Sequence, residues 1–297
     1  MDYENLPDDY FLTAGAFTKK LYRDQYPAID PTLPSLSQQG RVVVITGASS
    51  GLGAHGFPIS FAKAGAKAIW LVARDKQGLK ATRQRVVAVD PSIKVRAISL
   101  DVSDEVGVAR VFDQIKSEDG KVDVLINNAG LSRGGPITST AIDGIWKDFE
   151  VMVKGTFITS QYFTKLLGPT SRGYIINVSS IVAVLAMPGS DSYALSKMVQ
   201  SAMQRYIALL NPNIIATSLH PGTVATNIVP EFFSRFAKDT HDLAAGTALW
   251  LASEDAQFMN GRYMSANWSV EEMVERREEI VEHDLLKFDL KIAPYAT

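Results

Sequence analysis

Seven short, nearly continuous apolar segments constrain the fold of this chain more than any other feature. They are RVVVIT (41–46), AIWLVA (68–73), KVRAIS (94–99), VDVLIN (122–127), GYIINVS (173–179), NIIATSL (213–219) and GRYMSA (261–266). Such runs are typical of strands that are buried on both faces of a parallel sheet. The stretches between them, such as 104–118 and 192–210, have helical length. We therefore expect a doubly wound α/β sheet with helices on both faces, in a single domain.

Composition excludes several kinds of site and partner. The formal net charge of the 297 residues is −2 and no basic stripe is present, so we expect no nucleic-acid partner. The lack of cysteine excludes disulfides, thiolate catalysis and cysteine-ligated zinc, and the four histidines show no metal-ligand spacing. No apolar run reaches the roughly 18 residues of a spanning helix. The acidic start MDYENLPDDYF does not resemble a signal peptide, so we expect a cytoplasmic protein without a metal or a membrane partner.

Residues 1–40 are expected to form an extended, aromatic arm. Three prolines between Pro27 and Pro34 favour an extended path over a helix. The arm has more aromatic residues than a solvated tail normally carries: Tyr3, Tyr10, Phe11, Phe17, Tyr22 and Tyr26. We expect it to pack on the core or on a second subunit, and the alternative is a flexible leader.

Residues 269–297, which follow the α/β domain at 41–268, are expected to form a charged helix and a tail. Ser269 and Glu272 have the spacing of a capping box. Glu272 and Arg276 are four residues apart, in the order that favours a helical ion pair. The helix carries many charges, so its default interpretation is a solvated face.

A glycine-rich turn, Thr46-Gly47-Ala48-Ser49-Ser50-Gly51-Leu52-Gly53, follows the first predicted strand. Glycine permits a tight turn and lets backbone amides approach a pyrophosphate, and the helix N-terminus that follows favours an anion. The spacing G-x3-G-x-G differs from the common G-x-G-x-x-G fingerprint. Placed between a strand and a helix at the start of the domain, the turn predicts a dinucleotide site.

The end of the second predicted strand bears on the choice of dinucleotide. A basic residue there accommodates a ribose 2′-phosphate, and an acidic residue holds a free 2′-hydroxyl. Arg74 comes first and favours NADP(H), with Ser49 or Ser50 as helpers. Asp75 weakens this inference because its carboxylate could neutralise Arg74 or reach the ribose itself, so NAD(H) stays open.

Polar residues also follow the third and fourth predicted strands. Asp101-Val102 and Asn127-Asn128-Ala129-Gly130 stand at carboxyl ends of strands, where open α/β sheets bind ligands. Asn127 has two interpretations: it contacts the ligand, or its amide satisfies backbone groups between adjacent strands.

Tyr193 and Lys197 are four residues apart and so lie on one face of a predicted helix. The phenol of an isolated tyrosine titrates near pH 10, roughly three units too high for efficient proton exchange at neutral pH. A nearby ammonium lowers that pKa and makes the phenol a workable general acid or base. Ser180 closes the fifth predicted strand, where its hydroxyl could hydrogen-bond a substrate oxygen. The Y-x-x-x-K pattern is common by chance. It indicates a catalytic pair only because it occurs together with the other motifs of this chain.

Taken in order, TGASSGLG, NNAG, INVSS, YALSK and HPGTVAT resemble the motifs of short-chain dehydrogenases/reductases, and the likeness covers about residues 40–268. The resemblance implies a Rossmann-type, seven-stranded parallel sheet and an NAD(P)(H)-dependent oxidoreductase that interconverts a ketone and a secondary alcohol. It implies Tyr193 as acid/base, Lys197 as the residue that binds the ribose hydroxyls and lowers the pKa of Tyr193, and Ser180 as the residue that orients the substrate. The thirteen residues from Ser180 to Tyr193 match the usual spacing of the family, so Ser180 is preferred to Ser179.

The same resemblance implies the cofactor contacts and the assembly. The expected contacts are Thr46, Gly47, Ser49, Ser50, Gly51, Leu52, Gly53, Arg74, Asp101, Val102, Asn128, Ala129, Gly130, Tyr193, Lys197, Pro221, Gly222, Val224 and Thr226. A homodimer or homotetramer is expected from the habit of the family. The YPAID-P segment and the SANW ending look like a subgroup of filamentous fungi that is often found in secondary metabolism.

One position departs from the family pattern. The helix after NNAG usually carries an Asn three residues before a glycine, and Met152 stands there before Gly155. That Asn helps to hold a water in the proton relay to the lysine, and a thioether cannot replace its hydrogen bonding. The favoured interpretation is that Met152 simply fills the gap. The alternatives are impaired proton supply, slow turnover, or non-redox use of the pocket.

The substrate side is expected to be apolar. One wall is predicted from the segment after Thr226 and the other from the segment after Ser180, and together they favour a hydrophobic small molecule. These walls comprise Ile228, Val229, Phe232, Phe233 and Phe236, and Val182, Val184, Leu185, Met187 and Pro188. Some of these residues could instead belong to the core or to a dimer contact. Two further hypotheses stay open: a non-redox cyclase, epimerase or isomerase, and a dinucleotide-sensing protein without catalysis.

Overall fold

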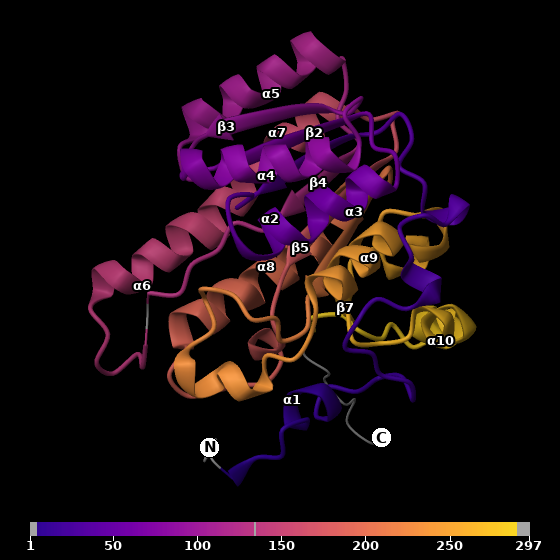
Figure 1. The fold of residues 1–297 in the computed structure, drawn as a ribbon. Coiled ribbons are helices and arrows are strands. Elements are labelled where there is room, and N and C mark those ends of the chain that lie inside the picture. The colour runs from indigo at the N-terminus through magenta and orange to yellow at the C-terminus, as the bar shows by residue number, and fades with distance from the viewer. Residues whose placement is uncertain (1–4, 134, 290–297) are drawn as a thin grey trace, which may run out of the picture.

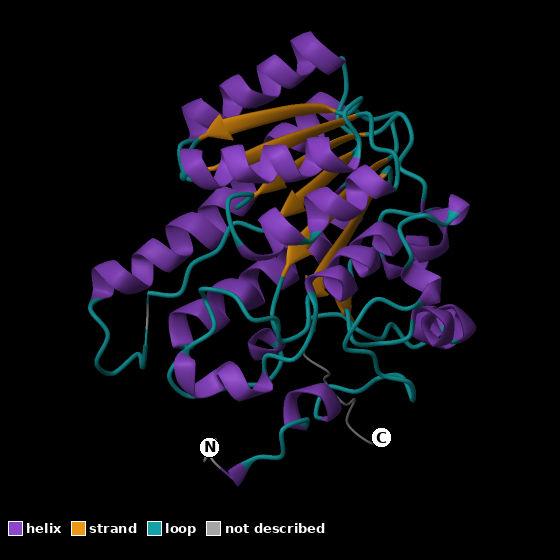
Figure 2. Cartoon of the chain, viewed as in Figure 1, coloured by secondary structure: helices purple, strands orange, loops and turns teal. Residues whose placement is uncertain are grey.

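The computed structural model describes residues 5–133 and 135–289, except for the side chain of Phe232. Seven parallel strands form one sheet in the order β3-β2-β1-β4-β5-β6-β7 (Figures 1 and 2). They are β1 Val42–Thr46, β2 Ala68–Ala73, β3 Lys94–Ser99, β4 Val124–Asn127, β5 Gly173–Val178, β6 Ile214–His220 and β7 Tyr263–Ser265. The predicted doubly wound parallel sheet is confirmed, and each strand begins and ends within two residues of its apolar run.

Helices cover both faces of the sheet because alternate strand residues point to opposite sides. Val43 and Ile45 of β1 belong to one apolar core, and Val42 and Val44 belong to the other. The first core also contains side chains of α2 Gly51–His55, α3 Phe57–Lys63, α4 Lys76–Val89 and α9 His241–Leu251. The second contains side chains of α5 Glu105–Asp119 and α7 Gly155–Leu167, and α8 Asp191–Leu210 packs beside α7 over β6.

A π-helical turn joins α6 Ile142–Phe149 to α7. The turn spans Glu150–Lys154, and the amide of Gly155 donates to the carbonyl of Glu150, five residues earlier. One extra residue is thus accommodated without ending the helix, a geometry often found near functional sites. Met152 lies in this turn and is fully buried.

The N-terminal arm packs on the core of the same chain. Ile29 and Leu36 are buried in the first core, in short 3-10 turns at Pro27–Ile29 and Pro34–Leu36. The hydroxyl of Tyr26 donates to the carbonyl of Trp268 at 3.1 Å and accepts from the amide of Val270 at 2.9 Å. This part of the arm therefore lies between α9 and the C-terminal segment. Tyr3 lies outside the described residues.

The C-terminal segment forms two short helices, α10 Val270–Glu275 and α11 Arg277–Glu282. The hydroxyl of Ser269 accepts from the amide of Glu272 at 3.3 Å, as predicted for an N-cap. The second hydrogen bond of a capping box, from the amide of Ser269 to the carboxylate of Glu272, was predicted wrongly. That carboxylate accepts instead from the amides of Lys19 and Lys20 at 2.7 and 2.9 Å. The side chain of Glu272 thus fastens the arm rather than its own helix.

Two other expectations for this segment are also corrected. The guanidinium of Arg276 forms its ion pair with Glu279 at 2.8 Å and not with Glu272, whose carboxylate is occupied by the arm. Met273 and Ile280 are fully buried, so the helices cover the core instead of presenting only a solvated face. Residues 290–297 of the predicted tail lie outside the described residues.

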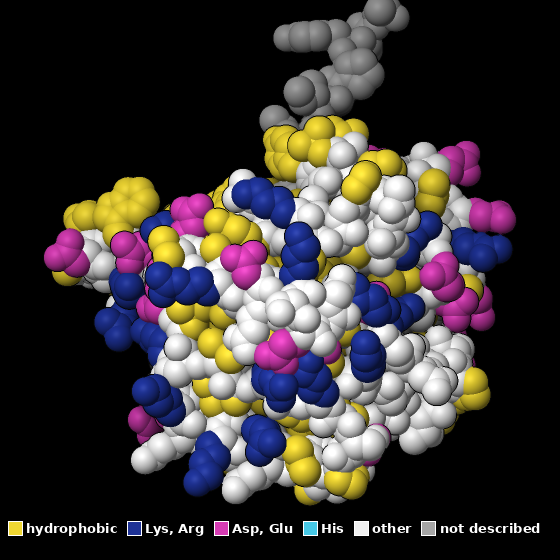
Figure 3. All heavy atoms as spheres, turned by 90° about the horizontal axis from the view of Figure 1, so that it is seen from above, with side chains coloured by type: hydrophobic (Ala, Val, Ile, Leu, Met, Phe, Trp, Pro, Cys, Tyr) yellow, Lys and Arg dark blue, Asp and Glu magenta, His cyan; other side chains and the backbone are white. Residues whose placement is uncertain are grey.

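Side chains of both signs are scattered over the face seen in Figure 3, among exposed apolar ones. In the described part of the chain no helix is both long and apolar enough to cross a membrane, and no group of three or more acidic or histidine side chains could hold a metal ion.

Candidate active site

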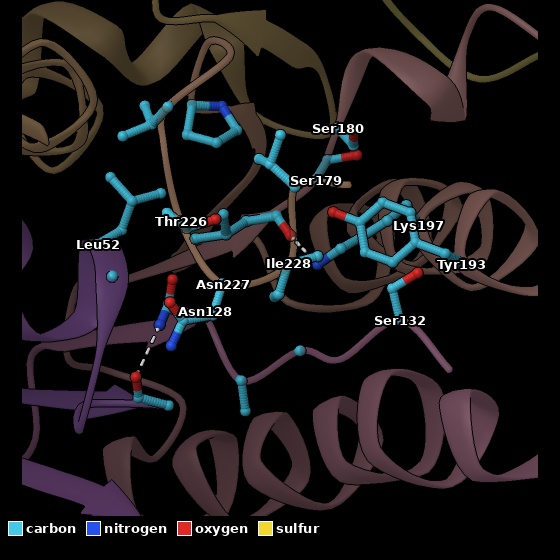
Figure 4. Close-up of a pocket in the computed structure, with 18 of the residues that line it drawn as sticks. Leu52, Asn128, Ser132, Ser179, Ser180, Tyr193, Lys197, Thr226, Asn227 and Ile228 are labelled. Atoms are coloured by element: carbon cyan, nitrogen blue, oxygen red, sulfur yellow. Dashed lines mark hydrogen bonds between the residues drawn. The ribbon is translucent and has the colours of Figure 1, made fainter. Parts of the chain in front are cut away.

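A cavity of about 640 Å³ opens at the carboxyl ends of the strands. It runs from the glycine-rich turn after β1 to Tyr193 on α8, so it joins segments that are far apart in the sequence (Figure 4). Eighteen of the predicted site residues line it: Gly47, Ser49, Ser50, Gly51, Leu52, Arg74, Asp101, Val102, Asn128, Ala129, Gly130, Ser180, Tyr193, Lys197, Pro221, Gly222, Val224 and Thr226.

The turn after β1 requires glycine for two different reasons. Gly47 and Gly51 have φ values of +65° and +50°, in the left-handed region that other residues rarely adopt. Gly53 lies in α2, and a Cβ there would overlap the carbonyl oxygen of Gly47. Gly53 does not line the cavity, so its contribution is close packing of the helix against the turn.

Thr46 also lies behind the wall of the cavity and is buried. Its hydroxyl accepts from the amides of Asn128 and Ala129, both at 3.0 Å. The side-chain amide of Asn128 in turn donates to the carbonyls of Thr46 and Gly47 at 3.0 and 3.2 Å. Thr46 therefore braces the segment after β4 against the glycine-rich turn. Neither Thr46 nor Gly53 lines the cavity, so each has a supporting role in this structure, and cofactor contact at these two positions stays a prediction.

Asn127 is structural. Its side-chain amide donates to Asn177 on β5 at 2.8 Å and to Ser160 on α7 at 3.1 Å, and its oxygen accepts from Thr159 at 2.7 Å. All of its polar atoms are thus used inside the core, away from the cavity. Of the two interpretations of Asn127, the structural one holds.

Arg74 and Asp101 border the far end of the cavity. The guanidinium of Arg74 is 57% exposed and lies 3.8 Å from the carboxylate of Asp101. Asp75 also lines the cavity and forms no ion pair with Arg74 among the described residues; one oxygen of its carboxylate accepts from the amide of Gln77 at 2.9 Å and caps α4. The side chain of Asp101 is held by Ser103, whose hydrogen bonds lower the pKa of Asp101 against the raising effect of burial.

Ser180, Tyr193 and Lys197 meet at the other end of the cavity (Figure 4). The hydroxyl of Ser180 accepts from the amide of Val182 at 3.4 Å, and it lies close enough to the phenol of Tyr193 to lower the pKa of that phenol. The ammonium of Lys197 donates to the carbonyl of Val178 at 2.6 Å and lies 5.6 Å from the centre of the Tyr193 ring. The neighbouring Ser179 points its hydroxyl at Ser201 instead, at 2.7 Å.

Burial dominates the ionisation of this group. Desolvation raises the pKa of Tyr193 to about 12, and the nearby hydroxyl of Ser180 offsets only part of that rise. Desolvation also lowers the pKa of Lys197 to about 7. Burial therefore outweighs any lowering of the pKa of Tyr193 by Lys197, which is itself only partly charged at neutral pH.

Met152 lies behind Lys197. A Cβ at Gly130 would be 3.7 Å from the sulfur of Met152 and 3.7 Å from the ammonium nitrogen of Lys197, so both atoms border the same glycine. The carbonyl of Met152 accepts from Thr156 at 2.6 Å, and the side chain of Gln200 donates to that threonine at 2.7 Å. The thioether thus fills the space, and the polar contacts of the turn come from its backbone.

The substrate end is apolar on two sides. The residues that line it as predicted are Ile228, Val229, Phe233, Val182, Met187 and Pro188. Phe236 is buried behind this wall, and Val184 is half exposed outside it. Leu185 packs with the same apolar cluster without lining the cavity, and the side chain of Phe232 is not described.

Sequence reasoning missed several residues of the site, among them the polar residues Ser132, Asn227 and Asp148. Ser132 and Asn227 line the cavity (Figure 4). Asn227 directly follows HPGTVAT and Ser132 stands two residues after NNAG, so their positions could have been inferred. Asp148 on α6 is fully buried, accepts from the hydroxyl of Ser192 at 2.7 Å and from the amide of Arg133 at 3.0 Å, and raises the pKa of Tyr193. No sequence signal marked it, because its partners come from two other segments.

Comparison with known proteins agrees with this architecture. The family model for short chain dehydrogenases matches residues 41–235. The chain is 34% identical to short chain dehydrogenase citE of Monascus ruber over 94% of its length and 99% of that protein, and 34% identical to short chain dehydrogenase pigC of the same organism over 95% and 94%. Among solved structures, levodione reductase superposes with a TM-score of 0.72 at 25% identity, covering 77% of this chain and 96% of that one.

Proposed function

The chain belongs to the short-chain dehydrogenase family, and from this membership we propose that it interconverts a ketone and a secondary alcohol on a hydrophobic small molecule. At the level of the family it is an NAD(P)-dependent oxidoreductase. The observation that carries the finer proposal is the meeting of Ser180, Tyr193 and Lys197 at one end of the cavity. The homologues named above are themselves called short chain dehydrogenases, which supports dehydrogenase chemistry.

The residues of the cavity fit a dinucleotide. Gly47 and Gly51 leave the turn without side chains where a pyrophosphate would approach, and a Cβ at Gly51 would lie 3.2 Å from Thr226 across the cavity. At the other end the ammonium of Lys197 is buried beside the cavity, where it would hydrogen-bond ribose hydroxyls. When bound, the dinucleotide supplies the hydride for reduction or accepts it in oxidation.

The side chains divide the remaining chemistry. Tyr193 gives its proton to the carbonyl oxygen as the carbonyl carbon receives the hydride, and Ser180 holds the same oxygen by a hydrogen bond. Because the pKa of Tyr193 is about 12, the phenol is protonated at neutral pH and ready for the reduction direction. Lys197 holds the ribose and, when protonated, favours the phenolate that forms.

We propose NADP(H) as the preferred cofactor. Arg74 lines the cavity beyond β2, and its only ion pair among the described residues is the 3.8 Å contact with Asp101. Asp75 caps α4 with one carboxylate oxygen and forms no ion pair with Arg74 among the described residues, so it does not neutralise the guanidinium that would meet a 2′-phosphate. A planar guanidinium suits a phosphate well.

The two alternatives have less support. A non-redox enzyme on the same scaffold was suggested by Met152, yet the ammonium of Lys197 is hydrogen-bonded to Val178 without any group from that position. A dinucleotide sensor has no use for an acid/base group, and here Ser180, Tyr193 and Lys197 line one end of the cavity together.

Tyr193→Phe tests the proposed mechanism, since the change removes only the phenolic oxygen. We expect ketone reduction with NADPH to fall at least about 100-fold, the contribution typical of a general acid, while NADPH binding stays within about threefold of the wild type. Tyr206→Phe, the same change at an exposed position of α8, serves as the control. Undiminished turnover in Tyr193→Phe would contradict the assignment.

A further inference from the structure

The N-terminal arm reaches the substrate end of the cavity. Its first helix, α1 Tyr10–Thr13, carries Phe11, whose ring is 5% exposed. The centre of this ring lies 4.6 Å from that of Phe233 and 4.9 Å from that of Phe236, in the 3-10 segment Glu231–Phe236. Phe11 therefore stands directly behind a residue that lines the cavity.

Phe11 also belongs to an apolar cluster that includes the opposite wall. The other members of this cluster include Ile181, Val182 and Met187, all of which line the cavity after Ser180. The arm is in close contact with this wall, because a Cβ at Gly15 would lie 2.8 Å from the Cδ1 atom of Ile181. The arm thus packs against both walls that a substrate would meet, and Phe11 lies in the cluster that joins them.

Polar contacts fasten the arm to the same segment. The carboxylate of Asp8 pairs with Lys238 at 2.6 Å and with Arg235 at 3.2 Å, and the guanidinium of Arg235 donates to the carbonyl of Leu6 at 2.8 Å. These groups are exposed, and exposed pairs contribute only about 0–1 kcal/mol each. The buried ring of Phe11 is therefore the main contact that fixes the position of the wall.

A second anchor lies at the end of the segment. The guanidinium of Arg23 pairs at 3.0 Å with Asp239, whose side chain is almost fully buried and accepts from the amide of Thr223 at 2.6 Å. The carbonyl of Arg23 accepts from the amide of Thr240 at 2.9 Å. The arm thus holds the segment from Thr223 to Thr240 at several points along its length.

We propose that Phe11 is a specificity-determining residue, which positions Phe233 and the wall after Ser180 and so sets the size of the substrate end. The inference rests on the proposed function in one respect, that this end of the cavity receives the ketone. Phe11 acts through its neighbours and does not touch the substrate.

The ratio of kcat/KM for a bicyclic ketone (2-tetralone) to that for a small one (cyclohexanone) tests the proposal. Truncation in Phe11→Ala leaves space into which Phe233 can withdraw, so we expect the ratio to rise about tenfold, the discrimination typical of a small change in an apolar pocket. KM should carry the change, with kcat for cyclohexanone within about threefold of the wild type. Phe11→Leu, which keeps most of the volume, should restore the ratio to near its wild-type value.

Phe17→Ala is the matched control on the same arm. The ring of Phe17 lies 5.4 Å from that of Trp268 and 3.7 Å from the guanidinium of Arg276, and Phe17 does not line the cavity. Its truncation should leave the ratio unchanged. An unchanged ratio in Phe11→Ala, or an equal shift in Phe17→Ala, would overturn the proposal.

Hydrogen exchange of residues 226–238 in the NADPH-bound protein gives a readout that does not depend on turnover. We expect faster exchange of this segment in Phe11→Ala and in Asp8→Asn, which leaves the apolar cluster intact, and no change in Phe17→Ala. If the wild type reduces no ketone, the proposed function fails, while the exchange measurement still decides whether Phe11 positions this wall. Exchange as slow as in the wild type in both arm variants would overturn the inference.

Discussion

The residues proposed to carry the chemistry owe their ionisation to burial more than to one another. Tyr193 and Lys197 are four residues apart on α8, and that spacing alone predicts that the ammonium lowers the pKa of the phenol. In the folded protein both groups are desolvated, which raises the pKa of Tyr193 and lowers that of Lys197. The sequence thus identifies the pair, whereas their ionisation depends on how deeply the helix is packed.

A pH profile tests the state of Lys197. Its pKa of about 7 means that the ammonium is present below that pH and is lost as the pH rises through it. Since kcat/KM reports groups of the free enzyme, we expect kcat/KM for NADPH to fall as the pH rises above about 7. The 2′-phosphate of NADPH also titrates, so NADH, which lacks this group, is the control. A flat profile of kcat/KM from pH 6 to 9 with both cofactors would contradict the lowered pKa of Lys197.

Arg74 is the residue on which the choice of cofactor rests. Its removal in Arg74→Ala should weaken NADPH binding about tenfold or more, the loss expected for one charge-assisted contact, and should leave NADH binding within about twofold. Fluorescence titration measures both dissociation constants. Arg83→Ala, an exposed arginine on α4 that does not line the cavity, provides the control. An equal loss for both cofactors would argue against a 2′-phosphate site.

At the scale of elements, the strands were predictable and several contacts between elements were not. Each apolar run became a strand because a parallel sheet buries both faces. The position of the arm depends on the hydrogen bond from Tyr26 to Trp268. The carboxylate of Glu272 binds the amides of Lys19 and Lys20 in the arm. These pairs are separated by more than 240 residues, so no local pattern indicates them.

The same limit applies to the candidate site. Glycine-rich and Y-x-x-x-K motifs located most of the lining, because their residues share one element or one turn. Asp148 and the contact from Gln200 to Thr156 were missed, since each joins different helices. Thr46 and Gly53 were placed in the correct turn, but only the packing distinguishes a residue that lines the cavity from one that supports it.

A substitution in the π-helical turn at Glu150–Lys154 tests whether Met152 limits proton supply. Met152 is fully buried there, so an amide in Met152→Asn would lose apolar packing in the core. We expect the melting temperature to fall by several degrees, as for a change of about 1–3 kcal/mol, while kcat for ketone reduction changes less than about twofold. A rise in kcat of tenfold would instead show that proton supply behind Lys197 limits the wild type.

At the scale of the whole molecule, one helical face is left apolar and exposed. Met198, Tyr206 and Leu209 of α8 lie on one stripe, and Phe157 of the neighbouring α7 is also about half exposed. We propose that a second copy of the chain covers this face. The chain would then assemble as a homodimer or homotetramer.

Light scattering tests the assembly. The wild type should have two or four times the 32.4 kDa mass of one chain, and the double variant Tyr206→Lys with Leu209→Lys should shift toward the monomer because charges replace apolar contacts. Val106→Lys, at an exposed position on α5, should leave the mass unchanged. A monomeric wild type, or an unaffected double variant, would contradict the proposed interface.

Isotope transfer tests the central claim most directly. NADPH that carries deuterium at C4 of the nicotinamide is supplied in both stereochemical forms with a hydrophobic ketone, and the alcohol is examined by mass spectrometry. We expect one form to place one deuterium on the carbinol carbon for each NADPH oxidised, and Tyr193→Phe to give almost no product. Product without deuterium from either form, and without oxidation of NADPH, would contradict the assignment as a ketone–alcohol oxidoreductase.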